Sequence, residues 1–206
     1  MVVIKRQSPA APGGNESASM EDIDFNTIKA IGRGDRSAFE LFVKKYQNPV
    51  VNFIFRYVRD RFTAQDLTQE VFLKVFQGAG EFEPRGKVSN WVFTIAFNLC
   101  ANELKRQKRR GYPYPDLSLG DPAELECPAH DQAGTRKKEL EEDLMAALDR
   151  LPENQRAALW LRVNEDLSYL EISQVLNISL AGVESLIFRA RKQLRQLMRG
   201  RNGSSP

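Results

Sequence analysis

Residues that usually carry catalysis or bind metals are scarce in this chain of 206 residues. It has one histidine, His130, and two cysteines, Cys100 and Cys127. Cys100 lies in an apolar helical pattern and Cys127 in a proline-rich stretch, which is unlike the framework of a disulfide-stapled secreted domain. Cys127 and His130 have the spacing of two metal ligands, but too few further ligands exist to close a zinc site. Without a phosphate loop or a nucleophile and base pair, the sequence predicts no metal, no cofactor and no enzyme.

Long apolar runs and strand-like alternation are scarce too. No segment approaches the length of a membrane span, and the start, MVVIKR, lacks the apolar core of a signal peptide. We therefore expect a cytoplasmic protein without membrane insertion. Apolar residues recur mostly at steps of three and four, which predicts an all-α protein. The length allows two small helical domains.

Proline, glycine and charge divide the chain. The net charge of +3 is too small to identify a nucleic-acid binder, but basic residues concentrate in two stretches, 85–110 and 189–201. Stretches rich in Pro, Gly and Ser predict tails and a linker. The expected order is a disordered tail (1–19), a first helical domain (20–110), a flexible linker (111–137), a second helical domain (138–198) and a second disordered tail (199–206).

Residues 168–197 predict two helices joined by a tight turn. Ser168 and Glu171 have the spacing of a capping box, and Ser179 can cap the second helix. The apolar residues at helical spacing are Leu170, Ile172, Val175 and Leu176, then Val183, Ile187, Ala190, Leu194 and Leu197. A polar and largely cationic face remains, as in a helix-turn-helix that enters the DNA major groove. An ordinary helical hairpin with a solvated basic face has the same spacing.

Residues 63–76 predict a helix with two different faces. Thr63 and Asp66 have capping-box spacing at its start. The expected buried side is Leu67, Val71, Phe72, Val75 and Phe76, and Asp66, Gln69 and Glu70 share the opposite side. Most such polar residues are simply solvated.

Start and stop signals place the other helices. Pro49 is expected in the first turn of a new helix, and Ser89 is expected to cap a helix that ends in five basic residues within 105–110. Pro152 is expected to begin another helix, with Leu161 and Val163 among its inward residues.

Several of these segments resemble one family. The segment DLTQEVF (66–72) is similar to region 2.2 of bacterial sigma factors of the extracytoplasmic-function (ECF) group, and residues 82–98 resemble its regions 2.3 and 2.4. The segments YLEIS, GVES and FRAR within 169–191 resemble region 4, and LPENQR (151–156) resembles the signature just upstream of its helix-turn-helix.

The resemblance implies a promoter-specificity subunit that binds core RNA polymerase at the β′ clamp helices and the β subunit. It implies reading of −35 and −10 promoter DNA, help in melting, and control by an anti-sigma factor. The candidate contact residues are Asp66, Gln69 and Glu70 for polymerase; Arg85, Lys87, Asn98, Lys105, Arg106 and Arg109 for the −10 element; and Ser179, Glu184, Ser185, Phe188, Arg189, Arg191 and Lys192 for the −35 element.

Within the −10 segment, Asn98 is the candidate for contact with a flipped base, and Phe82 and Trp91 are expected to be structural. Glu184 stands where basic residues are usual, and we hypothesise that it accepts a hydrogen bond from cytosine N4.

Three other functions compete with the sigma factor. A one-component transcription regulator would use the same helix-turn-helix but would not need the face at 66–70. A small helical enzyme would need catalytic groups that this sequence does not contain. An anti-sigma or scaffold protein would have no reason for basic residues in both DNA-reading segments.

Overall fold

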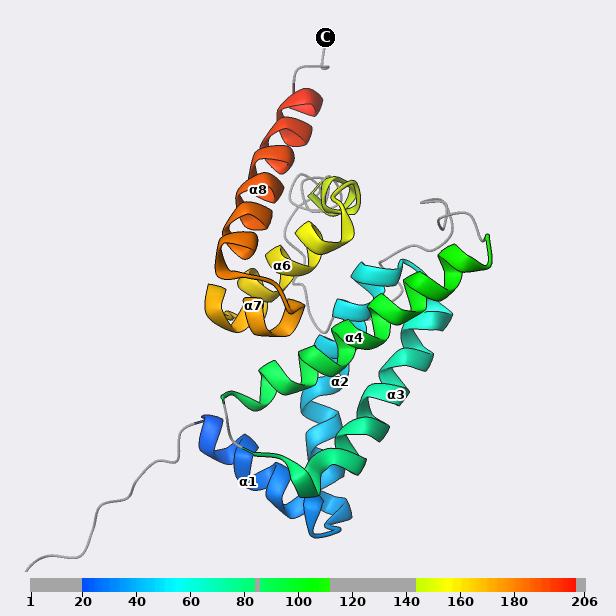
Figure 1. Cartoon of the computed structure of the whole chain (residues 1–206), viewed down its shortest axis with the longest axis vertical. Coiled ribbons are helices and arrows are strands. Elements are labelled where there is room, and N and C mark those ends of the chain that lie inside the picture. Colours follow the sequence, from blue (N-terminus) through cyan, green and yellow to red (C-terminus); the bar gives the residue numbers. More distant parts are fainter. Residues whose placement is uncertain (1–19, 84–85, 112–143, 203–206) are drawn as a thin grey trace, which may run out of the picture.

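The computed structural model describes residues 20–83, 86–111 and 144–202 (Figure 1). All regular elements within these ranges are helical, which confirms the all-α prediction. The first group is α1 (Met20–Gly32), α2 (Arg36–Val58), α3 (Arg61–Gly78), the 3-10 turn η1 (Ala79–Glu81) and α4 (Val88–Arg109). The second is a helical stretch at 144–149, α6 (Glu153–Val163), α7 (Tyr169–Leu176) and α8 (Leu180–Asn202). The predicted tail 1–19, most of the linker, Arg85, Cys127 and His130 lie outside the described residues.

Two predicted helix starts are wrong because a different residue begins the helix. Helix α3 starts at Arg61, since the Asp60 carboxylate accepts the Thr63 N–H at 2.7 Å, three residues before the predicted cap. Helix α4 starts at Val88, which is buried, so core packing rather than a Ser89 cap fixes its first turn.

Helix α2 is continuous, so the predicted break at Pro49 is wrong. Proline removes one backbone hydrogen bond from a helix interior. The buried side chains of Tyr46, Val50 and Phe53 on either side hold α2 together across this position. Helix α8 likewise continues to Asn202, past the predicted domain end at residue 198.

Aromatic side chains fill the core of the first group. Phe42 of α2 packs edge-on against Phe72 of α3, and Phe53 of α2 packs against Phe93 of α4. Tilted and edge-on ring pairs of this kind add to the stability gained by burial. The packing of α2, α3 and α4 fixes the outward faces of α3 and α4.

Three residues predicted to face inward are exposed: Phe76, Val163 and Leu170. Phe76 lies about 100° around α3 from buried Val75, at the edge of the core. Val163 is the last residue of α6. Leu170 lies in the first turn of α7, whose buried residues come later in the helix.

The two groups pack against each other, α4 on α7 and α2 on α6 (Figure 1). One hydrophobic core runs through both, from Phe53 and Phe93 to Leu161 and Leu167. The Tyr57 hydroxyl also donates to Asn154 Oδ1 across the junction at 3.1 Å.

Within the described residues, no single helix has the length and apolar content of a membrane span. Taken together, α7 and α8 reach that length and composition, but they bend by 101° at their junction.

Candidate polymerase and promoter interface

The helix-turn-helix is built by the signals that the sequence contains. The Ser168 N–H donates to Glu171 Oε2 at 2.6 Å and the Glu171 N–H donates to Ser168 Oγ at 3.2 Å, which confirms the capping box. Asn177 ends α7 in the left-handed conformation, and Ser179 Oγ accepts the Gly182 N–H at 3.1 Å. The bend of 101° between α7 and α8 lies within the range of about 90–120° for this motif.

Helix α8 separates into an inward and an outward face as predicted. Val183, Ile187 and Ala190 are buried. The outward residues are Ser179, Glu184, Ser185, Phe188, Arg189, Arg191 and Lys192, and Phe188 is 63% exposed. Ser179 is both exposed and committed to the cap of α8.

A groove of about 760 Å³ runs along this face, lined by Tyr169, Glu184, Phe188, Arg191 and Arg195. Glu184 and Phe188 are four residues apart and therefore neighbours on the helix surface. The carboxylate of Glu184 forms no hydrogen bond or ion pair among the described residues. This carboxylate is free to accept a hydrogen bond from a ligand.

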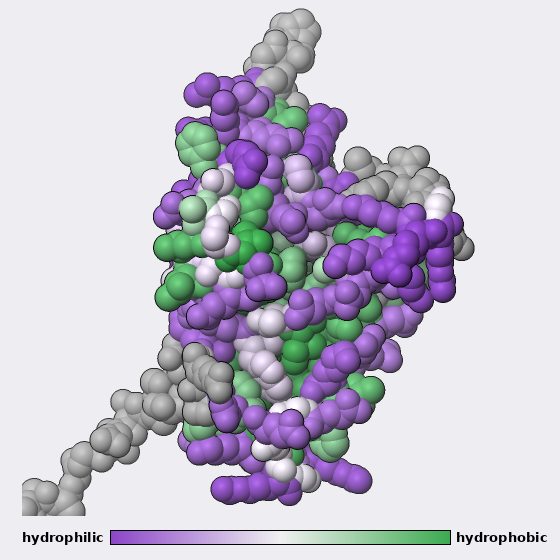
Figure 2. Space-filling view, viewed as in Figure 1, coloured by the Kyte–Doolittle hydropathy of each residue, from purple (hydrophilic) through white to green (hydrophobic). Residues whose placement is uncertain are grey.

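The surface of this domain is mixed in polarity. Figure 2 shows hydrophilic residues along the upper part of α8 and hydrophobic ones near the junction of α7 and α8. The exposed apolar residues there are Leu170, Ile178 and Leu180. The surface around the helix-turn-helix therefore contains apolar as well as charged side chains.

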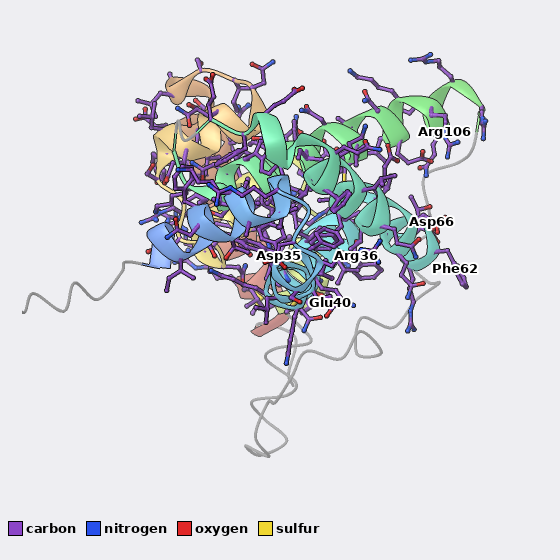
Figure 3. All side chains as sticks on the ribbon, turned by 90° about the horizontal axis from the view of Figure 1, so that it is seen from below. Asp35, Arg36, Glu40, Phe62, Asp66 and Arg106 are labelled. Atoms are coloured by element: carbon purple, nitrogen blue, oxygen red, sulfur yellow. The ribbon has the colours of Figure 1, made fainter. Side chains whose placement is uncertain are left out.

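Helix α3 exposes the predicted acidic and amide face. Asp66, Gln69 and Glu70 are exposed, opposite buried Leu67 and Val71. Figure 3 shows Asp66 with Phe62 at the N-terminal end of α3, away from Asp35 and Glu40.

Two apolar residues of this face were not predicted from the sequence, Phe62 and Leu73, which are 77% and 54% exposed. At about 100° per residue both lie within about 40° of Asp66, so the helical period could have found them. The exposed face of α3 combines apolar, amide and acidic groups.

The predicted −10 residues that are described lie along α4 and the loop before it. Asn98, Lys105 and Arg109 are exposed, and Lys87 is half-buried. Arg106 pairs with Glu103 at 2.7 Å, one turn away on α4. The cationic end of α4 is therefore solvent-facing, with part of its charge already paired.

A pocket of about 430 Å³ lies between this loop and α4. Its walls include Phe82 and Trp91, whose ring centroids are 4.7 Å apart, and the amide of Asn90. Asn98 does not line it. Asn90 was not predicted, because a polar residue in the first turn of a helix is usually a solvated one.

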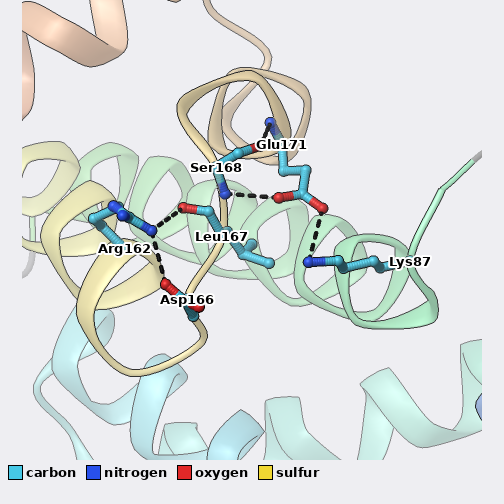
Figure 4. Close-up of polar contacts among 6 residues, drawn as sticks. All are labelled: Lys87, Arg162, Asp166, Leu167, Ser168 and Glu171. Carbon is cyan, nitrogen blue, oxygen red and sulfur yellow. Dashed lines mark hydrogen bonds and ion pairs between the residues drawn. The ribbon is translucent and has the colours of Figure 1, made fainter. Parts of the chain in front are cut away.

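Helix α7 reaches across the same loop. Glu171 Oε1 pairs with Lys87 Nζ at 3.5 Å (Figure 4), and Gln174 forms part of the pocket wall. Partial burial favours the protonated form of Glu171, but hydrogen bonds from Ser168, the Lys87 charge and the Asn90 amide outweigh it and lower its pKa. The carboxylate of Glu171 thus serves the cap of α7 and the contact with the loop together.

Similarity to known proteins shows which family the chain belongs to. A model of sigma-70 region 2 matches residues 42–110, and one of sigma-70 region 4 matches residues 141–194. The ECF RNA polymerase sigma-E factor of Haemophilus influenzae is 31% identical over 177 residues, 83% of this chain and 93% of that protein. The chain belongs to the ECF sigma factors.

Other relatives agree with this assignment. The sigma-H factor of Pseudomonas aeruginosa is 35% identical over 181 residues, 84% of this chain and 93% of that protein. The ECF sigma factor SigM of Bacillus subtilis is 34% identical over 154 residues, 74% of this chain and 90% of that protein.

Solved structures show the same fold. The sigma factor RpoE of Bartonella quintana, solved with the anti-sigma factor NepR, superposes with a TM-score of 0.63 at 21% identity, over 78% of this chain and 96% of that one. CnrH in complex with the cytosolic domain of CnrY gives 0.62 at 20% identity, over 89% and 100%.

A buried arginine joins the two domains of this sigma factor. Arg156 is only 3% exposed and donates to the carbonyls of Leu151 at 3.0 Å, Asp149 at 3.3 Å and Tyr57 at 3.4 Å. Burial, together with the neighbouring Arg59, lowers its pKa to about 10. Arg156 satisfies the last carbonyls of α2 and of the turn before α6.

A half-buried carboxyl group, that of Glu165, lies in the turn between α6 and α7. Burial raises the pKa of Glu165 to about 7, and the neighbouring Trp160 indole offsets part of that rise. Burial and the contact with Asp24 raise the pKa of Tyr46 in α2, and the charge of Glu165 across the junction adds to that rise.

Among the residues that the structure describes, no group of three or more His, Cys, Asp or Glu side chains could hold a metal ion. Cys100 is fully buried in α4, and burial raises the pKa of its thiol. It is a core residue in the structure.

Proposed function

We propose that this sigma factor docks on core RNA polymerase through the exposed face of α3, reads −35 and −10 promoter DNA through α8 and α4, and assists melting. It performs no covalent step itself, and it acts in the cytoplasm, where it meets polymerase and chromosome. The supporting observation is that Asp66, Gln69 and Glu70 remain exposed on a helix whose other face is buried. A regulator that binds DNA alone has no use for this face.

Docking on polymerase combines charge with apolar contact. The carboxylates of Asp66 and Glu70 attract a basic partner and fix register, which in protein complexes contributes more to specificity than to affinity. By family resemblance the partner is the pair of β′ clamp helices, and the second domain contacts the β subunit.

Reading of the −35 element rests on the outward face of α8. Arg189, Arg191 and Lys192 supply donors for phosphates or guanine edges. Ser179 and Ser185 are candidates for phosphate contacts. Phe188, at 63% exposure, can contact a thymine methyl group, and the free carboxylate of Glu184 can accept from cytosine N4.

The Glu184 contact is tested with a promoter library randomised in the −35 element. We expect Glu184→Ala to lose about tenfold preference for cytosine at one position, since a base contact discriminates by about 1–3 kcal/mol. An unchanged preference for cytosine would show that Glu184 does not read a base of the −35 element.

Contacts to the −10 element are proposed along α4 and its preceding loop, through Lys87, Asn98, Lys105, Arg106 and Arg109. Arg85, outside the described residues, belongs to the same proposed set. Cationic side chains bind phosphates in a salt-dependent way, and removal of any one of them lowers the salt dependence of binding. Melting of the DNA is favoured if these residues bind the separated strand more tightly than the duplex.

An anti-sigma factor is a further proposed partner. RpoE of Bartonella quintana, which shares this fold, was solved with one. Transcription with purified components tests the sigma activity without knowledge of that partner or of the inducing signal.

The test is run-off transcription with bacterial core RNA polymerase, with and without this protein, on fragments of its own genome. We expect protein-dependent transcripts that share paired upstream elements. Asp66→Ala and Glu70→Ala should abolish them and weaken core binding, whereas Glu40→Ala, an exposed carboxylate on α2, should not. Sequence-specific DNA binding without transcripts or core binding would favour the one-component regulator instead.

A further inference from the structure

A pocket of about 400 Å³ lies where the end of α2 meets the turn before α6. Three arginines line it, Arg59 from the first domain and Arg150 and Arg156 from the second. The volume lies within the range of about 300–1,000 Å³ for small-ligand sites. None of the three arginines belongs to the residues proposed above to contact polymerase or promoter DNA. A ligand in this pocket would leave those contacts untouched.

The arginines of the pocket have donors without acceptors. Within the described ranges, the Arg59 guanidinium forms no hydrogen bond or ion pair, although it is half-buried and its Nε is fully buried. Arg156 is 3% exposed, and its Nε likewise has no partner there. Buried polar groups are nearly always hydrogen-bonded, so two such groups at one pocket indicate a missing acceptor.

The two acidic residues of the pocket already have basic neighbours that do not line it. Asp149 Oδ1 lies 3.7 Å from Arg56 Nη1, and Glu153 Oε1 lies 3.9 Å from Lys108 Nζ. Each carboxylate is thus shared with a cation outside the pocket. The pocket lining therefore has an excess of positive charge.

The guanidinium groups repel one another. Burial lowers the pKa of Arg156 to about 10, and the charge of Arg59 adds to that fall. Burial also lowers the pKa of Arg59, and the carboxylates of Asp149 and Glu153 offset only part of the change. The charged forms of both arginines are therefore disfavoured, and an anion bound between them would stabilise both.

Helix α6 begins at the same pocket. Pro152 and Glu153, its N-cap and its first residue, line the pocket, and no side chain caps the helix. The N–H groups of a first helical turn have no acceptor within the helix, and together with the helix dipole they attract anions. Guanidinium groups and helix N-termini are two donors that proteins use to bind phosphate. Their combination at one pocket suits a phosphate group.

We infer that this junction pocket binds a phosphate group, either free phosphate or that of a small phosphorylated molecule. Arg59 lies at the end of α2 and Arg150 in the turn before α6, so the ligand bridges the two domains. The full set of donors exists only while α2 packs on α6, and a bound phosphate therefore favours the packed arrangement. Separation of the domains thereby becomes sensitive to a small anion.

The experiment measures the binding of three probes to the full-length protein by isothermal titration calorimetry at constant ionic strength. The probes are inorganic phosphate, pyrophosphate and guanosine diphosphate, which distinguish free phosphate from a phosphorylated molecule. We expect saturable binding of at least one probe at a single site. Arg59→Met and Arg150→Met should each weaken it about tenfold, the loss expected for one hydrogen bond to a charged group. The matched control is Arg189→Met, an exposed arginine of α8, which should bind as the unaltered protein does.

Urea denaturation separates ligand binding from a structural role. In phosphate-free buffer, Arg59→Met and Arg150→Met should keep or raise the midpoint, because each removes a charge from a mutually repelling set. Saturating probe should raise the midpoint of the unaltered protein, as any ligand of the folded state does, and should not raise that of Arg59→Met. If Arg59→Met does not fold, Arg150→Met gives the decisive comparison.

Two results would overturn the inference. One is the absence of saturable binding of any probe, or equal binding by the Arg59, Arg150 and Arg189 variants. The other is weaker binding of a promoter duplex, but of no small probe, in the Arg59 and Arg150 variants, because these arginines would then contact DNA. None of these measurements uses polymerase, so the proposed function is tested separately by run-off transcription.

Discussion

Replacement of Arg156 by Met tests whether the buried guanidinium joins the two domains. Met keeps much of the apolar volume but removes the donors to Leu151, Asp149 and Tyr57 carbonyls. Hydrogen bonds from charged groups contribute about 1.5–3 kcal/mol each, and two of these three are long, at 3.3 and 3.4 Å. Relief of the desolvation that lowers the Arg156 pKa offsets part of the loss.

The expected net loss is about 2 kcal/mol in the free energy of unfolding, measured by urea denaturation. The long bond to Tyr57 crosses the domain junction. Its removal should also lower cooperativity, so that fluorescence of Trp91 in the first domain and Trp160 in the second, isolated by single Trp→Phe replacements, reports different midpoints.

The control is Arg189→Met, since Arg189 is exposed and its hydrogen bond to the Ser185 carbonyl stays within α8. Its stability should stay within about 0.5 kcal/mol of the unaltered protein. If Arg156→Met is equally harmless, the carbonyl bonds do not stabilise the junction and the reasoning fails.

Three further predictions concern single groups. Because the folded-state pKa of Glu165, about 7, exceeds its ordinary value of 4.5, stability should fall as pH rises from 5 to 8. The expected change in urea denaturation is about 1–2 kcal/mol after allowance for solvent screening, and an unchanged slope in Glu165→Gln would contradict it. Ser168→Ala should cost about 1 kcal/mol of stability because it removes the cap of α7, and a cost near zero would mean that water replaces the hydroxyl. Cys100, buried with a raised thiol pKa, should react with a thiol reagent only in denaturant, and rapid reaction in native buffer would show that α4 opens locally.

Local signals predicted much of the fold. Caps and apolar periods act within one helix, so Ser168, Glu171 and the buried stripe of α8 are where the sequence places them. The start of α3 was missed because two caps compete three residues apart, and Asp60 lies nearer the end of α2. Such errors are small shifts in a correct helix.

Contacts between distant segments could not be predicted. From the sequence alone, Arg156 would be expected at the surface, since arginine is rarely buried. Its burial follows from its hydrogen bond to the Tyr57 carbonyl near the end of α2, a distant segment. Asn90 contacts Glu171, 81 positions later, and lines the same pocket as Phe82 and Trp91, which no local sequence pattern indicates. The family resemblance supplied the candidate residues on α3 and α8, whose exposure the structure confirms.

Any partner that binds only when the two domains are apart must compete with the packing of α4 on α7. Such a partner binds with its intrinsic dissociation constant divided by the fraction of open molecules, so each tenfold decrease in that fraction costs about 1.4 kcal/mol of affinity. Substitutions within the Lys87 and Glu171 contact therefore change two quantities together, the contact itself and the open fraction. A change confined to the junction, such as Tyr57→Phe, which removes the bond to Asn154, strengthens the binding of every such partner by one common factor without touching any of them.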